Sequence, residues 1–418
     1  MIPVQGQANS SAQGLSPKAQ CLVFVMAAIF VFSRRPDLIT HAHFYAEDGA
    51  EWYAAAYNTG WLHALTQTAG GYLNTLQRLV ASVSLLLPIR YAPLLMNVSG
   101  LIIQVLPALF LLSNRCVGWW PLRIRFLQAA IYVLLPNTRE VHILLTNAPF
   151  HLAFLAFLVA IAKPPLHWRW KLFDIGVLAV SALSGPFCIV LFPLVLFFWW
   201  HRRQPWSLVV IAVLAPLIAI QALELLLGGY AGRAPVQLGA TPMLFMQLVT
   251  GQVYVGSLWG ENGFSLHAQL FAVMLVMLLG TSVLLYAVSR ATLELRLFVV
   301  FAFLILAASL SKPLIGGGLP LWQLLAIDRS ARYWFFPMLA VLWCLLYCAT
   351  QRNDRRVRIA ACLTFIAMLH GIVHDHRYPP YPDQNFQLFL RNFAAAPSGT
   401  QVLLPDCPPG EVSYLRKK

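Results

Sequence analysis

Long apolar segments, separated by short polar connections, repeat along nearly the whole chain. The segments are roughly 15–25 residues long, about the length that a helix needs to cross the ~30 Å hydrocarbon core of a bilayer. We therefore predict an all-α polytopic membrane protein with about 11 membrane-spanning helices, in a range of about 11–13. The predicted spans are 19–33, 91–112, 124–138, 148–162, 172–184, 187–200, 206–227, 264–288, 293–310, 333–350 and 357–374.

Composition agrees with this prediction. Of the 418 residues, 59% are hydrophobic and only 11% are charged, whereas a soluble chain carries roughly a quarter charged residues. A mean hydropathy of +0.68 excludes a water-soluble enzyme and a disordered scaffold. The net charge is +14, but most basic residues lie between apolar segments, where they orient a membrane protein. We therefore predict membrane lipids as partners and no nucleic acid.

Basic connections predict the orientation of the chain. The connections 113–125, 163–171, 201–205 and 351–358 are short and rich in arginine or lysine. All four lie on the cytoplasmic side if the N-terminus is cytoplasmic and the C-terminus is extracytoplasmic. An additional span at 72–88 would put the later connections on the opposite side. The orientation therefore requires segment 72–88 to be a non-spanning helix in the membrane interface.

Two regions follow from this topology. Residues 1–374 form a transmembrane module, whose first outer loop, 34–90, contains interfacial helices. Residues 375–418 form a short extracytoplasmic tail, which we expect to be a small cap or a strand or two. The chain shows no internal repeat, which counts against a transporter built from inverted repeats. It has no glycine-rich nucleotide loop, so we predict no ATP-driven pumping.

The first outer loop carries the most concentrated candidate chemistry. Glu47, Asp48 and Glu51 lie within five residues of one another, beside several aromatic residues. A carboxylate at a water–lipid boundary is partly desolvated, which raises its pKa and makes it a better general base. The alternative interpretation is that Asp48 caps a helix over 49–57 and that the two glutamates are solvated.

A metal site in this loop is the weaker interpretation. His41 and His43, together with Glu47 or Asp48, could bind a divalent cation. Loop histidines are more often ordinary surface residues, however, so we predict no resident metal and no cofactor.

Two further outer segments contain candidate binding residues. Asn147 and His151 are spaced to share one helix face toward a cavity, or else Asn147 caps that helix and His151 lies in the interface. Arg332 opens an apolar span and Arg78 lies inside segment 72–88. A cation at such a depth is usually turned toward a carboxylate or a phosphate. Asp328 is the nearby carboxylate, and snorkelling to the interface is a further alternative.

Several short motifs together resemble the GT-C superfamily of integral-membrane glycosyltransferases, and more closely a mostly uncharacterised group of bacterial polytopic proteins. Each motif is weak alone, but their order and predicted sidedness agree. The motifs are Ala46-Glu47-Asp48-Gly49, Gly71-Tyr72 with Arg78, Asn147 with His151, Ser184-Gly185-Pro186-Phe187 and Arg332-Tyr333.

The resemblance implies a polyprenyl-phosphate sugar donor used at the outer face, without a nucleotide site. It implies a first-loop carboxylate as general base, which is Asp48 or, as second choice, Glu47. It also implies a substrate-binding set in which Arg332, and then Arg78, hold the donor phosphate. Many relatives read Asp-Glu where this chain reads Glu-Asp. The other members of the binding set are Tyr72, Asn147, His151 and Tyr333.

We therefore predict a glycosyltransferase of the bacterial inner (plasma) membrane. It would transfer the sugar to a glycan or lipid acceptor in biosynthesis of the cell envelope. The alternative is a transporter or flippase for a lipid-linked glycan, which would need the arginines but no base. A third interpretation, an O-acyltransferase, has only His370 and His374 as candidates and no partner nucleophile.

Overall fold

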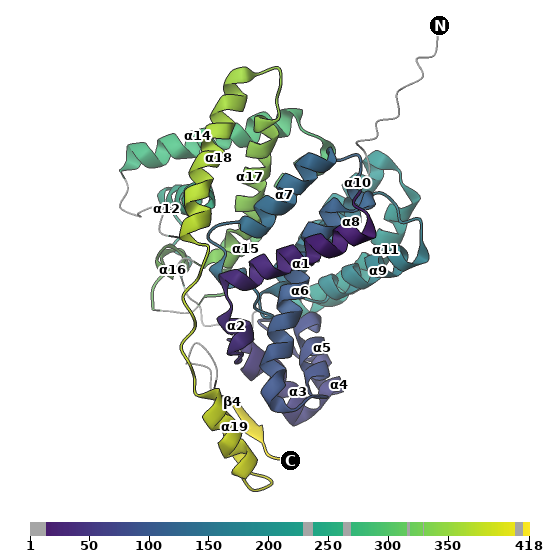
Figure 1. Ribbon diagram of the computed structural model, residues 1–418, viewed down its shortest axis with the longest axis vertical. Helices are drawn as coiled ribbons and strands as arrows, with labels where there is room; N and C mark the ends of the chain where they lie inside the picture. The colour runs from purple at the N-terminus through teal and green to yellow at the C-terminus, as the bar shows by residue number, and fades with distance from the viewer. Residues whose placement is uncertain (1–13, 229–236, 262–268, 316–317, 329, 406–412) are drawn as a thin grey trace.

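The computed structural model describes residues 14–228, 237–261, 269–315, 318–328, 330–405 and 413–418. A helix lies at each of the eleven predicted spans (Figure 1). These helices are α1 (Pro17–Arg34), α6 (Ala92–Leu112), α7 (Leu122–Leu134), α8 (Ala148–Ile161), α9 (Trp168–Ala182), α10 (Phe187–Arg202), α11 (Pro205–Leu227), α14 (Leu270–Arg290), α15 (Leu293–Ser311), α17 (Phe335–Ala349) and α18 (Arg355–His374).

Six helical segments among the described residues are long and apolar enough to cross a membrane. They are α1, α11, α14, α15, α18 and α6 together with the turn η2 (Ile89–Tyr91) that precedes it. Helices α8, α10 and α17 are equally apolar but shorter. The architecture is mostly helical and compatible with a polytopic membrane protein, while the number of spans stays a prediction.

Helices α8 and α17 form the centre of the bundle. Every residue of α8 is buried, as are nearly all residues of α17. The Trp343 ring of α17 lies 4.7 Å from Phe298 of α15 and 5.6 Å from Phe154 of α8, between ring centroids. A helix that is apolar on all sides needs such a position. The outer helices instead expose apolar side chains, among them Leu22, Phe271 and Leu278.

Residues 34–90, the predicted first outer loop, fold into short elements. They are α2 (Asp37–Thr40), the π-helix η1 (Asp48–Tyr53), α3 (Ala54–Thr59), α4 (Trp61–Thr66), the antiparallel strands β1 (Thr68–Ala69) and β2 (Tyr72–Leu73), and α5 (Thr75–Ser84). Helix α5 has 10 residues, about 15 Å of rise, and is too short to cross a bilayer. Its Gln77 and Arg78 side chains are buried, whereas Leu79 and Val83 are exposed. An exposed apolar face of this kind suits contact with lipid.

Two helical regions were not predicted from the sequence. One runs from α12 (Pro242–Leu248) through the π-helix η5 (Val249–Val255) to α13 (Gly256–Trp259). The other is α16 (Leu321–Asp328). In the first, Thr250 and Gln252 interrupt the apolar pattern. Helix α13 packs so closely on α18 that a Cβ at Gly371 would stand 2.5 Å from the carbonyl oxygen of Leu258.

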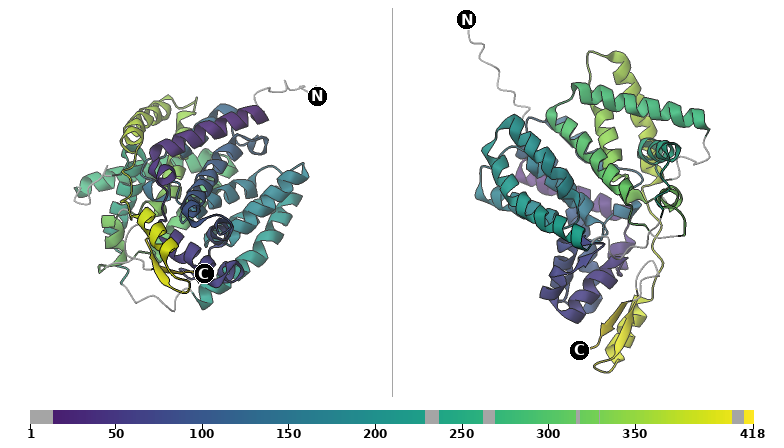
Figure 2. Two further views of the ribbon diagram at one scale, coloured as in Figure 1. Left: turned by 60° about the horizontal axis from the view of Figure 1, so that its bottom comes forward. Right: turned by 180° about the vertical axis from the view of Figure 1, so that it is seen from behind.

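The tail forms a small cap on the first outer loop. It contains α19 (Phe386–Ala395) and the antiparallel hairpin of β3 (Gln401–Leu404) and β4 (Ser413–Arg416). After α18 the chain runs past the first loop to the end of the molecule where α3 to α5 lie (Figure 1; Figure 2). The Asn58 amide of α3 joins the two parts by donating to the carbonyl oxygen of Tyr414, at 2.7 Å.

Candidate functional site

A left-handed turn immediately precedes the two candidate acids of the first loop, Glu47 and Asp48. Ala46 has φ +47°, which is uncommon for a residue other than glycine. The π-helix begins immediately afterwards at Asp48, so Glu47 occupies the cap position that the sequence offered to Asp48. Asp48 is only 1% exposed, whereas Glu47 is half-buried. Irregular helices of this kind are frequent at functional sites.

Glu47 is joined by hydrogen bonds to the loop that holds the main partner of Arg332. Its Oε2 atom accepts a hydrogen bond from the Thr146 hydroxyl, at 2.7 Å. Burial alone would lower the pKa of Arg332, but the Glu140 carboxylate, Tyr333 and, more weakly, the Glu47 carboxylate outweigh burial, so the pKa is raised. The guanidinium therefore keeps its charge next to an acid of the first loop.

The main partner of Arg332 is Glu140, which the sequence did not single out. Arg332 belongs to the turn η6 (Ala331–Tyr333), and Glu140 to the turn η4 (Arg139–Val141). The guanidinium forms an ion pair with Glu140 Oε1, and the backbone N–H of Arg332 donates to Oε2 at 3.1 Å. Its other terminal nitrogen donates to the carbonyl oxygen of Leu314, at 2.6 Å. The side chain of Asp328, the partner named from the sequence, lies outside the described residues.

Buried side chains fix the loop that carries Glu140. The Asn147 amide donates to the carbonyl oxygen of Glu140, at 2.8 Å. His151 Nε2 donates to the carbonyl oxygen of Val141, at 2.7 Å, and its Nδ1 meets the Tyr132 hydroxyl at 2.8 Å. Asn147 and His151 thus bind the consecutive carbonyl oxygens of Glu140 and Val141 instead of pointing together into a cavity.

His142 holds the same loop from the other side. Its Nε2 donates to the carbonyl oxygen of Val31 at 2.8 Å, and its Nδ1 is 3.1 Å from the Gln104 amide. Burial and then the positive charge of Arg34 lower the pKa of His142, which keeps the ring neutral. Polar loop residues that are usually on the surface are here fully enclosed and hydrogen-bonded.

This enclosed loop depends on Gly100 of α6. A Cβ at Gly100 would stand 1.8 Å from the carbonyl oxygen of Ile143, and a backbone atom in a buried loop cannot yield. We expect Gly100→Ala to lower the free energy of unfolding by about 1–3 kcal/mol or more, measured by thermal unfolding in detergent. Gly176→Ala in α9 is the matched control, because a Cβ there meets nothing within 4 Å. Equal losses in both variants would contradict the close packing of the loop.

Arg78 lies in a separate environment within the first loop. Its guanidinium donates to the carbonyl oxygen of Glu51 at 3.3 Å and lies over the Trp52 ring, 5.0 Å from the centroid. Burial lowers the pKa of Arg78, and the charge of Glu51 partly offsets that effect. Arg78 is therefore held by Glu51 and Trp52 of the first loop itself.

Tyr72 and Tyr333 also have structural contacts. Tyr72 lies in β2, which packs against the Ser184-Gly185 turn: Gly185 N–H donates to the carbonyl oxygen of Leu73, at 3.2 Å. The Tyr333 hydroxyl accepts from the N–H of Leu314 at 2.8 Å. The motifs around Tyr72 and Ser184 therefore form one junction.

The tail adds a residue to the cluster that the sequence did not indicate. The Tyr381 ring lies 4.5 Å from the Tyr45 ring and under the Arg35 guanidinium at 3.5 Å. Its N–H donates to Asp37 Oδ2 at 3.2 Å. Burial, Tyr381 and the charge of Glu140 raise the pKa of Tyr45. Tyr45 and Tyr381 thus border the Glu47–Arg332–Glu140 cluster.

The candidate metal ligands do not converge. His41 is exposed and pairs with the Thr40 hydroxyl at 3.0 Å, whereas His43 is buried edge-on against Tyr381. Within the described part of the chain, no group of three or more His, Cys, Asp and Glu side chains is arranged to hold a metal ion.

Comparison with known proteins adds no assignment. No protein-family model, curated protein or solved structure matches this chain. The functional argument therefore rests on the residues and contacts above.

Proposed function

We propose that the protein is a GT-C-like glycosyltransferase of the bacterial inner membrane, acting at the outer face with its N-terminus in the cytoplasm. It would transfer a sugar from a polyprenyl-phosphate donor to a glycan or lipid acceptor of the cell envelope. One set of contacts carries the proposal. Glu47 of the first loop accepts a hydrogen bond from the Thr146 hydroxyl, and the next residue, Asn147, holds the backbone of Glu140, whose carboxylate pairs with Arg332 before α17.

The arrangement supports a reaction with a carboxylate base. Glu47 would accept the proton of the acceptor hydroxyl, whose oxygen forms a bond to the anomeric carbon of the donor sugar. The bond from that carbon to the phosphate oxygen breaks, and the lipid phosphate leaves with the electron pair. Arg332, whose side chain is 26% exposed, would stabilise the growing negative charge.

Glu47 suits the base role better than Asp48. A general base has to reach the substrate proton within hydrogen-bond distance. Asp48 is enclosed at the start of η1, while Glu47 is partly open. We therefore assign proton transfer to Glu47 and the positioning of the turn to Asp48.

The test is to supply the purified protein in proteoliposomes with polyprenyl-phosphate sugars carrying a labelled sugar, together with an envelope acceptor fraction. A glycosyltransferase moves the label into a new, acid-stable acceptor product. Label that only crosses the bilayer, with no new glycosidic bond, would identify the flippase alternative instead.

Arg332 offers a second test of the same proposal. We expect Arg332→Gln to lower kcat by ~10²–10³-fold, the usual effect of removing one charge-stabilising group. Arg332→Lys keeps the charge and should retain part of the activity, because lysine lacks the planar fork. The measurement is kcat per folded molecule. Unchanged kcat in Arg332→Gln would remove Arg332 from the mechanism.

A further inference from the structure

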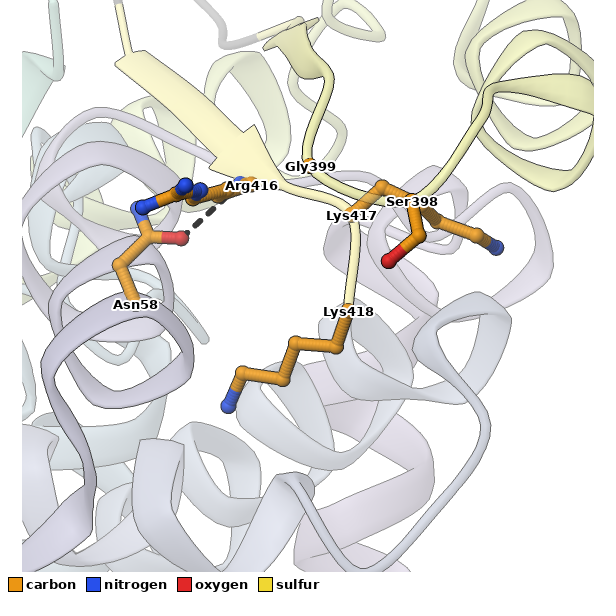
Figure 3. A pocket seen from close by; sticks show the side chains of 6 residues that line it. All are labelled: Asn58, Ser398, Gly399, Arg416, Lys417 and Lys418. Carbon is orange, nitrogen blue, oxygen red and sulfur yellow. Dashed lines mark hydrogen bonds between the residues drawn. The ribbon is translucent and has the colours of Figure 1, made fainter.

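A basic pocket lies between the tail and the first outer loop, away from the candidate site (Figure 3). Its volume is about 260 Å³, close to the lower end of small-ligand sites. Three segments contribute to it: α3, the turn at 398–399 and the end of β4. The lining residues are Asn58, Ser398, Gly399, Arg416, Lys417 and Lys418.

The backbone around the pocket is held in place by hydrogen bonds. Asn58 Oδ1 accepts from the N–H of Arg416 at 3.0 Å, while its amide nitrogen donates to Tyr414. The N–H of Gly399 donates to the carbonyl oxygen of Lys417 at 2.8 Å, and Lys417 N–H donates to Thr400 at 2.9 Å. Gly399 has φ +89°, a conformation that glycine adopts without strain. The side chains of Arg416, Lys417 and Lys418 therefore extend from a backbone that these hydrogen bonds hold in place.

The cationic side chains are distributed by strand alternation, in which successive side chains point to opposite faces. Arg416 and Lys418 lie on the Asn58 side of the pocket, and Lys417 is directed to the other side (Figure 3). The Lys418 ammonium lies 4.7 Å from the Tyr57 ring centroid, and that of Lys417 lies 4.7 Å from the Phe393 centroid. None of the six described lining residues has an acidic side chain, whereas three of them have cationic ones.

We propose that this pocket binds one anionic group, a carboxylate or phosphate, on a sugar of the acceptor glycan. The inference rests on the proposed function and deepens it by naming an acidic acceptor. The pocket is concave, so a single charged sugar can enter it, whereas a flat bilayer surface cannot. Its frame joins the tail to the first loop, and that loop also carries Glu47. A glycan held here would extend from the same structural unit as the proposed base.

The test uses trigalacturonate as probe, with protein in nanodiscs of neutral lipid and binding followed by thermophoresis. Wild type is expected to bind trigalacturonate in a salt-sensitive manner, with inorganic phosphate as competitor and no binding of neutral maltotriose. Arg416→Gln with Lys418→Gln should weaken binding at least ~10-fold, because two charge-assisted contacts are lost together. The matched control is Arg377→Gln with Arg391→Gln, which removes the same charge from two exposed tail positions outside the pocket. It should bind as wild type does.

Three results would overturn the inference. One is equal weakening by both double variants, and the second is equal binding of maltotriose. The third is binding only to vesicles of phosphatidylcholine with phosphatidylglycerol, which would make the pocket a membrane contact. Glu47→Gln should bind trigalacturonate normally, since the pocket does not contain Glu47. Loss of transfer in Glu47→Gln together with unchanged binding in Arg416→Gln/Lys418→Gln would reject the pocket and leave the glycosyltransferase proposal standing.

Discussion

Glu47→Gln is expected to lower sugar transfer by ~10²–10⁴-fold, the usual contribution of a positioned general base. Glutamine has the same shape and can still accept the hydrogen bond that the Thr146 hydroxyl donates at 2.7 Å, but it cannot take a proton. Folding should therefore be preserved. The measurement is the single-turnover rate with a labelled polyprenyl-phosphate donor, together with the thermal unfolding midpoint.

Neighbouring acids provide the controls for this prediction. Glu51→Gln makes the same chemical change four residues later at an exposed position, and it should retain the rate because Arg78 contacts the Glu51 backbone carbonyl. Asp48→Asn should reduce stability more than the rate per folded molecule. If folded Asp48→Asn loses transfer while Glu47→Gln keeps it, the two acids have been assigned in the wrong order. Full activity in both variants would exclude a first-loop base.

Asp174→Asn is expected to lower the free energy of unfolding by about 3–5 kcal/mol, because it leaves a buried cation uncompensated. Asp174 Oδ1 and Oδ2 accept from the Arg115 guanidinium at 3.0 and 2.8 Å, and Oδ2 also accepts from the Trp206 indole at 3.1 Å. The Asp174 side chain is 0% exposed and that of Arg115 is 7% exposed. Arg115 also donates to the carbonyl oxygen of Lys163. Unfolding by denaturant in detergent measures the loss.

A second arginine–carboxylate pair, whose arginine is less buried, serves as the comparison. Arg202 and Glu294 are 2.9 Å apart, but the Arg202 side chain is 44% exposed. Water can solvate its guanidinium when the partner is removed, so Glu294→Gln should cost less than about 1 kcal/mol. Similar losses in Asp174→Asn and Glu294→Gln would show that burial does not govern the stability of these pairs.

The helices were predictable because their signal is local. Apolar runs and their basic ends are read directly from the sequence, and each predicted span contains a helix. The contact between Arg115 and the carbonyl oxygen of Lys163 places the connections 113–125 and 163–171 together, while the side of the membrane on which they lie stays a prediction. The run from α12 to α13 was missed because its polar residues break that pattern.

The partners within the site were not predictable, because they depend on contacts between distant residues. Glu140 and Arg332 are 192 residues apart, and nothing near either residue specifies the other. The polar loop residues Asn147, His142 and His151 have the character of surface residues until the fold encloses them. The choice between Glu47 and Asp48 depends on which side chain the fold buries, and two adjacent acids give no sequence signal for that difference.

The contact between the end of α1 and the tail has a consequence for biosynthesis. The Arg34 guanidinium donates to the Tyr378 hydroxyl at 2.7 Å, across 344 residues of chain. During translation, Arg34 is made long before Tyr378 exists, so other groups or water must solvate the cation in the meantime. Closing so large a loop is among the slow events of folding. Assembly of this contact therefore finishes only after α18 and the residues that follow it have been synthesised.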